Sequence, residues 1–152
     1  MMRRTGFGLL LAGCIAGTAS AAPFVVVDAS PTITAMVDRG ATTRGGGFAT
    51  TDVLLISGST DSQLVMMRFD CTARTWQQIT VRMVLADYSL SPARASVTPA
   101  RAVGTETLGA SILEKACFDR LVKSGAGWSR PTLREAVEAG RRALARQAAG
   151  GT

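Results

Sequence analysis

The sequence predicts an α+β domain: an antiparallel β-meander sheet with a packed helix, a C-terminal helix and one disulfide. Three observations predict this fold. Extended segments rich in β-branched residues fill positions 24–86 and are joined by short turns. Helix patterns follow only after an irregular stretch, 87–105. Two cysteines, Cys71 and Cys117, stand one in each part of the chain.

Residues 1–21 have the three-part pattern of a secretory signal peptide. Two arginines precede an apolar run without acids, and an Ala-Ser-Ala cleavage pattern ends at Ala21. The run is shorter than the roughly 20 residues that span a bilayer. A Leu-Ala-Gly-Cys stretch ending at Cys14 also fits a lipobox, in which Cys14 would be lipidated. Both alternatives predict export to the periplasm or the outer-membrane surface of a Gram-negative bacterium.

The composition argues against most catalytic chemistries. The chain has no histidine, which removes Ser-His-Asp and Cys-His catalysis and histidine metal sites. It has no phosphate-loop, dinucleotide-fold or S-x-x-K pattern. Its 11 acidic residues are scattered. We therefore expect no enzymatic activity, no cofactor and no metal, with a hydrolase of paired carboxylates as the alternative.

The charge balance is mildly basic and indicates the kind of partner. The chain has 17 basic and 11 acidic residues, so loss of Arg3 and Arg4 with a signal peptide would leave a net charge of +4. This excess favours a protein or an anionic envelope component as partner, with peripheral or lipid-anchored membrane contact. It is too dispersed to indicate nucleic-acid binding.

The cysteine count predicts one disulfide in residues 22–126, the expected folded domain. With Cys14 removed or lipidated, Cys71 and Cys117 remain, and two cysteines in an oxidising compartment pair. Their bridge would close a loop of about 47 residues, worth about 4 kcal/mol in the chain-entropy model. The alternative is two separate buried thiols. The absence of a Cys-x-x-Cys pair argues against redox activity.

Short connections between the extended segments predict antiparallel neighbours. Residues 39–47 end in three glycines, which we interpret as a hairpin connection rather than an anion-binding loop, because no helix start follows. The last strand should present one wholly apolar face, formed by alternate residues between positions 79 and 85. The expected strands cover residues 24–28, 32–38, 48–57, 63–70 and 75–86.

A helix is predicted to begin with the capping box Ser111-Ile-Leu-Glu114 and to end at Lys123-Ser-Gly125. Leu113, Cys117 and Leu121 would then share one face, so that Cys117 points toward the sheet.

Residues 127–152 are expected to form an Arg-rich C-terminal helix and a disordered tail. A second capping box, Thr132 to Glu135, begins the helix, and an apolar stripe runs along it. Arg141, Arg142 and Arg146 crowd the other side and are candidates for contact with an anionic surface. The alternative is a solvated helix lightly packed on the sheet, with Gly140 weakening its middle.

The segment Asp70-Cys-Thr-Ala-Arg74-Thr-Trp76 resembles a motif of the surface-adhesin protein E-like family of small Gram-negative envelope proteins. Asp38, followed by the Arg44-x-Gly46 turn and a long strand, is similar to a second feature of that family. The likeness covers roughly residues 24–120. It implies an antiparallel sheet with a packed helix, a cysteine bridge between them, an envelope location and adhesion to host proteins.

The resemblance supplies no catalytic residues. We expect Arg74 and Trp76 to set local packing, with an Arg74 salt bridge such as one to Asp70. Together these observations predict an exported cell-envelope binding or adhesin-like protein without catalytic activity. The alternative is a periplasmic structural or accessory protein that contacts anionic envelope components.

Overall fold

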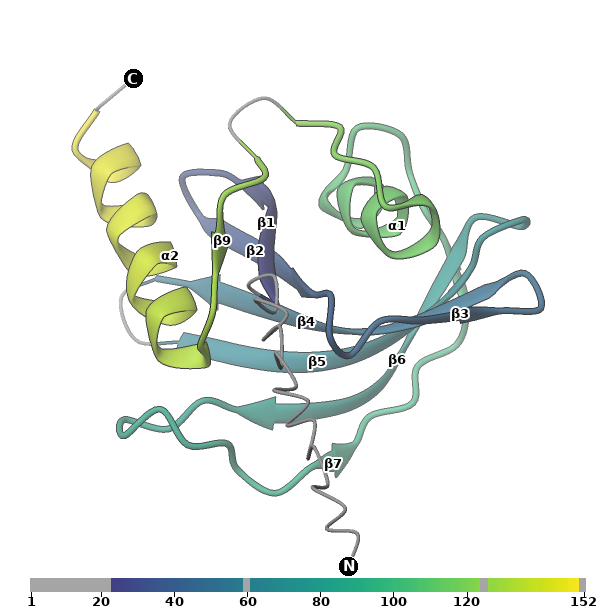
Figure 1. The fold of residues 1–152 in the computed structure, drawn as a ribbon, viewed down its shortest axis with the longest axis horizontal. Helices are drawn as coiled ribbons and strands as arrows, with labels where there is room; N and C mark the ends of the chain where they lie inside the picture. Colours follow the sequence, from purple (N-terminus) through teal and green to yellow (C-terminus); the bar gives the residue numbers. More distant parts are fainter. Residues whose placement is uncertain (1–22, 59–60, 124–125, 151–152) are drawn as a thin grey trace, which may run out of the picture.

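The computed structural model describes residues 23–58, 61–123 and 126–150 (Figure 1). The predicted signal peptide, Cys14 and the last two residues lie outside these ranges. Across the described chain there are nine strands in one antiparallel sheet and two helices. The elements are β1 (Phe24–Ala29), β2 (Ile33–Asp38), β3 (Thr43–Gly45), β4 (Phe48–Ser57), β5 (Asp61–Asp70), β6 (Thr75–Met83), β7 (Arg94–Ala95), β8 (Arg101–Ala102), α1 (Leu108–Phe118), β9 (Ser129–Arg130) and α2 (Leu133–Ala148).

The predicted α+β fold is confirmed. The main path of the sheet runs β7-β6-β5-β4-β2-β1-β9, with β3 paired to β4 and β8 paired to β6. Strands β4 and β5 form its longest hairpin, paired over ten residues each. The glycines before β4 form a hairpin connection, as expected: Gly46 and Gly47 have φ of 58° and 82°, which a two-residue turn of the primed type requires. Residues 43–45, expected to be loop, pair with β4 as strand β3.

The two helices cover opposite faces of the sheet. Successive side chains of a strand point to opposite faces, and on β4 the neighbours Val53 and Leu54 belong to different hydrophobic clusters. Val53 packs in the cluster beneath α1, whereas Leu54 packs in the cluster beneath α2. Figure 1 shows α1 and α2 well apart, with β1, β2 and β4 between them. The centre of the sheet is therefore buried on both sides.

The predicted bridge forms between Cys71 and Cys117, whose Cα atoms are 5.7 Å apart. Cys71 lies in the turn between β5 and β6, and Cys117 lies in the last turn of α1. The Arg44 guanidinium also holds this end of α1, because its Nε donates to the Ala116 carbonyl at 2.5 Å. The bridge therefore ties helix to sheet, as the sequence predicted.

The predicted bounds of the first helix were wrong. The helix begins after Thr107, whose hydroxyl accepts from the Ala110 amide at 3.2 Å. Ser111 is buried within it and donates to the Asp28 carboxylate at 3.1 Å. Asp119, with φ of 55°, ends the helix in the left-handed region. Leu121 consequently lies outside the helix and is 43% exposed.

Helix α2 begins and ends as predicted, but its packing differs from the lightly packed alternative. The Thr132 hydroxyl caps the helix as predicted: it accepts from the Glu135 amide at 3.2 Å and donates to the Glu135 carboxylate at 2.8 Å. Gly140 is buried against the sheet, and a Cβ there would lie 2.2 Å from Ile56 Cδ1. The glycine allows the close approach of α2 to β4 rather than simply weakening the helix.

The predicted apolar face of β6 is only partly covered. Val81 packs against the cluster beneath α1, but Met83 and Leu85 are 39% and 46% exposed. Val84, expected on the polar side, is buried in the other cluster. Met83 and Leu85 are exposed because α1 does not extend over them. The helix has only 11 residues and packs on β1, β2 and β4 more than on β5.

Arg74 makes a different ion pair from the expected one. Its guanidinium lies 2.9 Å from Glu114 on α1, and Arg120 binds the other oxygen of the same carboxylate at 2.9 Å. Asp70 instead accepts from the amides of Thr72 and Ala73 and so shapes the turn. The Arg74 pair therefore joins the same two elements as the disulfide does.

Candidate binding cleft beside helix α2

The apolar stripe of α2 is buried against the sheet. Ala136 and Val137 are fully buried, and Leu144 is 6% exposed. The helix therefore cannot lay this stripe on a membrane without leaving the sheet. The exposed outer side of the helix, which includes Arg142, Ala145, Arg146 and Ala148, is the part open to a ligand.

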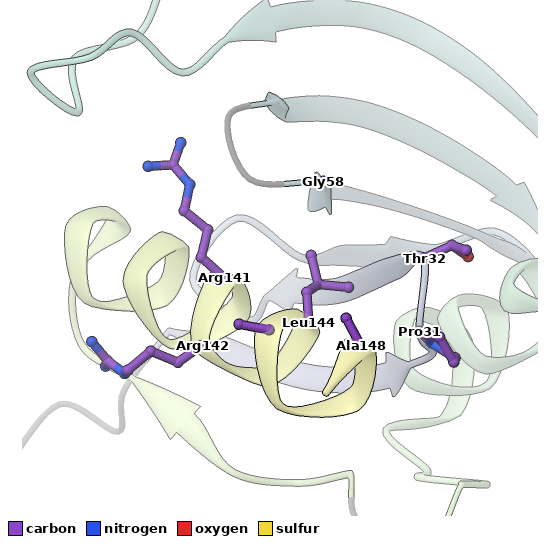
Figure 2. A pocket seen from close by; sticks show the side chains of 8 residues that line it. Pro31, Thr32, Gly58, Arg141, Arg142, Leu144 and Ala148 are labelled. Carbon is purple, nitrogen blue, oxygen red and sulfur yellow. The ribbon is translucent and has the colours of Figure 1, made fainter. Parts of the chain in front are cut away.

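A cleft of about 710 Å³ runs beside the second half of α2. Arg141 and Arg142 line it, whereas Arg146, the third arginine singled out from the sequence, does not. Figure 2 shows Leu144 on the side of the helix that faces Gly58 and Arg142 extending away from the strands. The remaining lining comes from α2, from the β1–β2 turn and from the end of β4, at Pro31, Thr32, Gly58, Ala145 and Ala148.

These turn residues were missed as site residues in the sequence. Pro31 and Gly58 are 27 positions apart, but the pairing of Ile33 with Ser57 brings them to one end of the sheet. Helix α2 then passes beside the same end. The antiparallel connectivity was predictable and could have placed the two turns together; the position of α2 over them could not be deduced.

The cleft combines an apolar surface with the positive charge of Arg142. Leu144, Ala145 and Ala148 present only carbon atoms beyond the backbone, and no acidic residue is among its described lining. The Arg142 side chain is 61% exposed, and its nearest carboxylate, Glu138, is 3.8 Å away on the same helix. An exposed pair at this distance is weak, so the Arg142 guanidinium can turn to an external anion.

Ionisable groups at the other end of the molecule are used structurally. Lys115, whose side chain is 7% exposed, lies 2.6 Å from the Asp119 carboxylate at the end of α1. This hydrogen bond is the main cause that holds the pKa of Asp119 below its ordinary value; burial opposes it, and the charges of Lys115, Arg39 and Arg44 lower the pKa further. No periodic pattern in the sequence predicts this cluster, because its members come from three separate elements.

Two carboxylates, Asp38 and Asp52, lie near each other on adjacent strands. Partial burial raises the pKa of Asp52, the Asp38 charge raises it further, and Arg82 lowers it in part. Asp38 is committed to its own turn, where it accepts from the amides of Gly40 and Ala41 at 2.8 and 3.2 Å. Neither residue lines the cleft beside α2.

We predict that Asp52→Asn stabilises the protein at neutral pH. A carboxyl whose pKa is raised on folding disfavours the charged native state, so stability is lost as pH rises through the raised value. The increase in the free energy of unfolding caused by asparagine should shrink on acidification and vanish below about pH 3.9, the ordinary aspartate pKa. Urea denaturation of both proteins at a series of pH values measures this difference.

Asp87→Asn is the control of opposite sign. Hydrogen bonds from Ser89 lower the pKa of the exposed Asp87 carboxyl more than burial raises it, so this variant should not be stabilised at neutral pH. Equal behaviour of the two variants would contradict the assignment of the Asp52 shift to its surroundings.

Within the described ranges no group of three or more histidine, cysteine, aspartate or glutamate side chains is arranged to hold a metal ion. No helix in the described part of the chain is both long and apolar enough to cross a membrane.

No protein-family model matches the chain, and no curated protein or solved structure shows significant similarity to it.

Proposed function

We propose that this protein is an exported cell-envelope binding protein that acts without catalysis, and that its ligand is an anionic lipid. The observation that carries the proposal is the cleft beside α2, whose lining includes both apolar side chains and the exposed Arg142. An acyl chain would lie along the exposed Ala145 and Ala148, at the edge of the buried Leu144. A headgroup phosphate would meet Arg142, because a guanidinium and a phosphate form strong charge-assisted hydrogen bonds.

Three features support export as part of this proposal. The first 21 residues have the signal-peptide pattern. The disulfide between Cys71 and Cys117 is of the kind that persists in oxidising compartments. An envelope location would also bring anionic lipid within reach. The mass of the mature protein would distinguish cleavage after Ala21 from acylation of Cys14.

An adhesin-like role is the second candidate. The resemblance around Asp70 to Trp76 implies it, and exposed apolar residues at and just beyond the end of α1 favour it: Phe118, Leu121 and Val122 are 43%, 43% and 52% exposed. A protein partner could cover such a run. Protease treatment of intact cells tests surface display, since complete protection behind an intact outer membrane would rule out this role.

We predict that Arg142→Gln weakens binding of a short-chain anionic lipid about fivefold. The probe is dihexanoyl phosphatidylglycerol below its micelle concentration, with dihexanoyl phosphatidylcholine as the zwitterionic comparison. An exposed ion pair is worth up to about 1 kcal/mol, which is about a fivefold change in affinity. Titration calorimetry at low and high salt measures it, and added salt should weaken binding.

Arg146→Gln is the matched control. It removes the same charge from the same helix at an exposed position outside the cleft, so it should change affinity little. Ala148→Leu should weaken binding without changing the charge, because Ala148 lines the cleft. If Arg142→Gln and Arg146→Gln weaken binding equally and Ala148→Leu does not, the cleft is not the site.

A further inference from the structure

A second cavity lies on the opposite face of the sheet, beside α1. Its volume is about 470 Å³, within the range of small-molecule sites. Trp76 on β6 forms one wall, Ile112 and Leu108 on α1 form another, and Val65 and Met67 on β5 form the floor. We call it the Trp76 cavity.

The cavity exists because α1 covers the sheet incompletely. The helix packs on β1, β2 and β4, with less contact to β5. Every residue of β6 remains partly or largely exposed, although two apolar side chains on this face, Trp76 and Val81, pack at the margin of the cluster beneath α1. A mostly apolar surface over β5 and β6, toward the β7 edge of the sheet, is thus left open beside the helix.

The far wall of the cavity is fixed in place. Strand β8 pairs with β6, so that Arg101 lies opposite Trp76. The Val103 amide then donates to the Arg74 carbonyl at 2.9 Å, and the Thr107 hydroxyl donates to the Gly104 carbonyl at 2.8 Å. These hydrogen bonds hold the segment between β8 and α1 against the sheet. The cavity is therefore bounded on this side by a segment that hydrogen bonds hold in place.

Charge decides which kind of ligand fits. Arg101 is the one charged side chain among the described residues that line the cavity, and the lining contains no acid. Gln78, on the same wall, is held by a hydrogen bond of 2.6 Å to Ser96. The remaining side chains are mostly apolar. A ligand with an apolar body and one negative group matches this arrangement, whereas a cation does not.

We propose that the Trp76 cavity binds a small apolar carboxylate, such as a medium-chain fatty acid, with its chain against Trp76 and its carboxylate at Arg101. This inference is independent of the proposed function, because the cleft beside α2 lies on the other face of the sheet. The volume suits a single small molecule rather than a protein helix. A second copy of the chain is the main competing occupant.

The two tryptophans make the site directly observable. Trp76 lines the cavity, whereas Trp128 packs with the cluster beneath α2. In a Trp128→Phe variant, decanoate below its micelle concentration should shift the remaining emission with a saturable titration. In a Trp76→Phe variant, the Trp128 emission should not respond. A response confined to Trp128 would overturn the proposal.

The role of Arg101 is tested in the Trp128→Phe background. Arg101 is exposed, so Arg101→Gln should leave the fold intact, as thermal melting would verify. It should weaken decanoate binding about tenfold and leave decanol binding unchanged. Arg142→Gln, in the other cleft, should not alter decanoate binding to Trp76. If decanoate binds no better than decylamine, or if Arg101→Gln has no effect, the carboxylate assignment is wrong.

Self-association provides the last check. Sedimentation should show a monomer both with and without decanoate. A dimer that decanoate does not dissociate, and in which Trp76 fails to respond, would mean that a second copy covers the cavity and would overturn the proposal.

Discussion

Replacing Gly140 with leucine is expected to lower the free energy of unfolding by about 3 kcal/mol, at the upper end of the cost of overpacking a core. A Cβ at this position would lie 2.2 Å from Ile56 Cδ1 and 3.4 Å from Met36 Cε. Ile56 and Met36 are both fully buried. Leucine has a higher helix propensity than glycine, so the helix itself would gain stability and a net loss must come from the contact with the sheet. Urea denaturation measures it.

An exposed site on the same helix supplies the control for this variant. Ala145→Leu adds nearly the same atoms at an exposed position of α2, so its unfolding free energy should change by less than about 0.5 kcal/mol. A similar loss in both variants would mean that the helix tolerates no larger side chain anywhere, and the specific contact would be refuted.

A double-mutant cycle can identify the contact atom. Gly140→Ala gains about 1 kcal/mol of helix propensity but meets Ile56 Cδ1. Ile56→Val removes that carbon and by itself costs about 1 kcal/mol. In the Ile56→Val background, Gly140→Ala should therefore be less costly than in the native background by about 1 kcal/mol or more. Additive effects would show that the Ile56 side chain moves aside freely.

Removal of the disulfide by a Cys71→Ala, Cys117→Ala double variant is expected to cost about 4 kcal/mol. The bridge spans 46 positions in sequence, so it restricts a large loop of the unfolded chain. The native fold should persist at low temperature, because Leu113 and Ala116 of α1 remain fully buried and Arg44 and Arg74 still hold the helix. Denaturation curves of the oxidised protein and the double variant measure the difference.

Chemical reduction provides the independent comparison. The reduced native sequence should unfold at the same urea concentration as the double variant, within the effect of two alanines. If reduction leaves the urea concentration at half-unfolding unchanged, the bridge does not stabilise the protein by restricting the unfolded chain.

Local patterns in the sequence predicted the fold well where neighbouring residues decide the structure. The bounds of β4 and the end of α2 at Ala148 follow from periodicity and composition. The capping box at Thr132 predicted the start of α2, but the equally good pattern at Ser111 did not start α1, because Thr107 caps that helix one turn earlier. A capping motif identifies a candidate, and tertiary burial of Ser111 decides against it.

The sites were less predictable than the fold, because each depends on contacts between distant segments. Sequence reasoning singled out Arg141 and Arg142 by composition, and the structure places both at one cleft but leaves out Arg146. It did not single out the cavity, although Trp76 was named as a motif residue. Strand β6 stays partly exposed because α1 does not extend over it. No local pattern in the sequence shows how far across the sheet a helix will lie.

The burial of β4 on both faces has a consequence for how its pairing is specified. In a strand with one solvent-exposed face, a register shift of one residue moves the apolar side chains into solvent, so the shifted pairing is less stable. Around Val53, Leu54 and Ile56 both faces are apolar and buried, so a slip there would exchange one apolar side chain for another. The ends of the hairpins must then select the correct alignment. The Gly46-Gly47 turn and the turn that contains Arg74 each have residues at positive φ. These turns therefore set the register of the strands that they join.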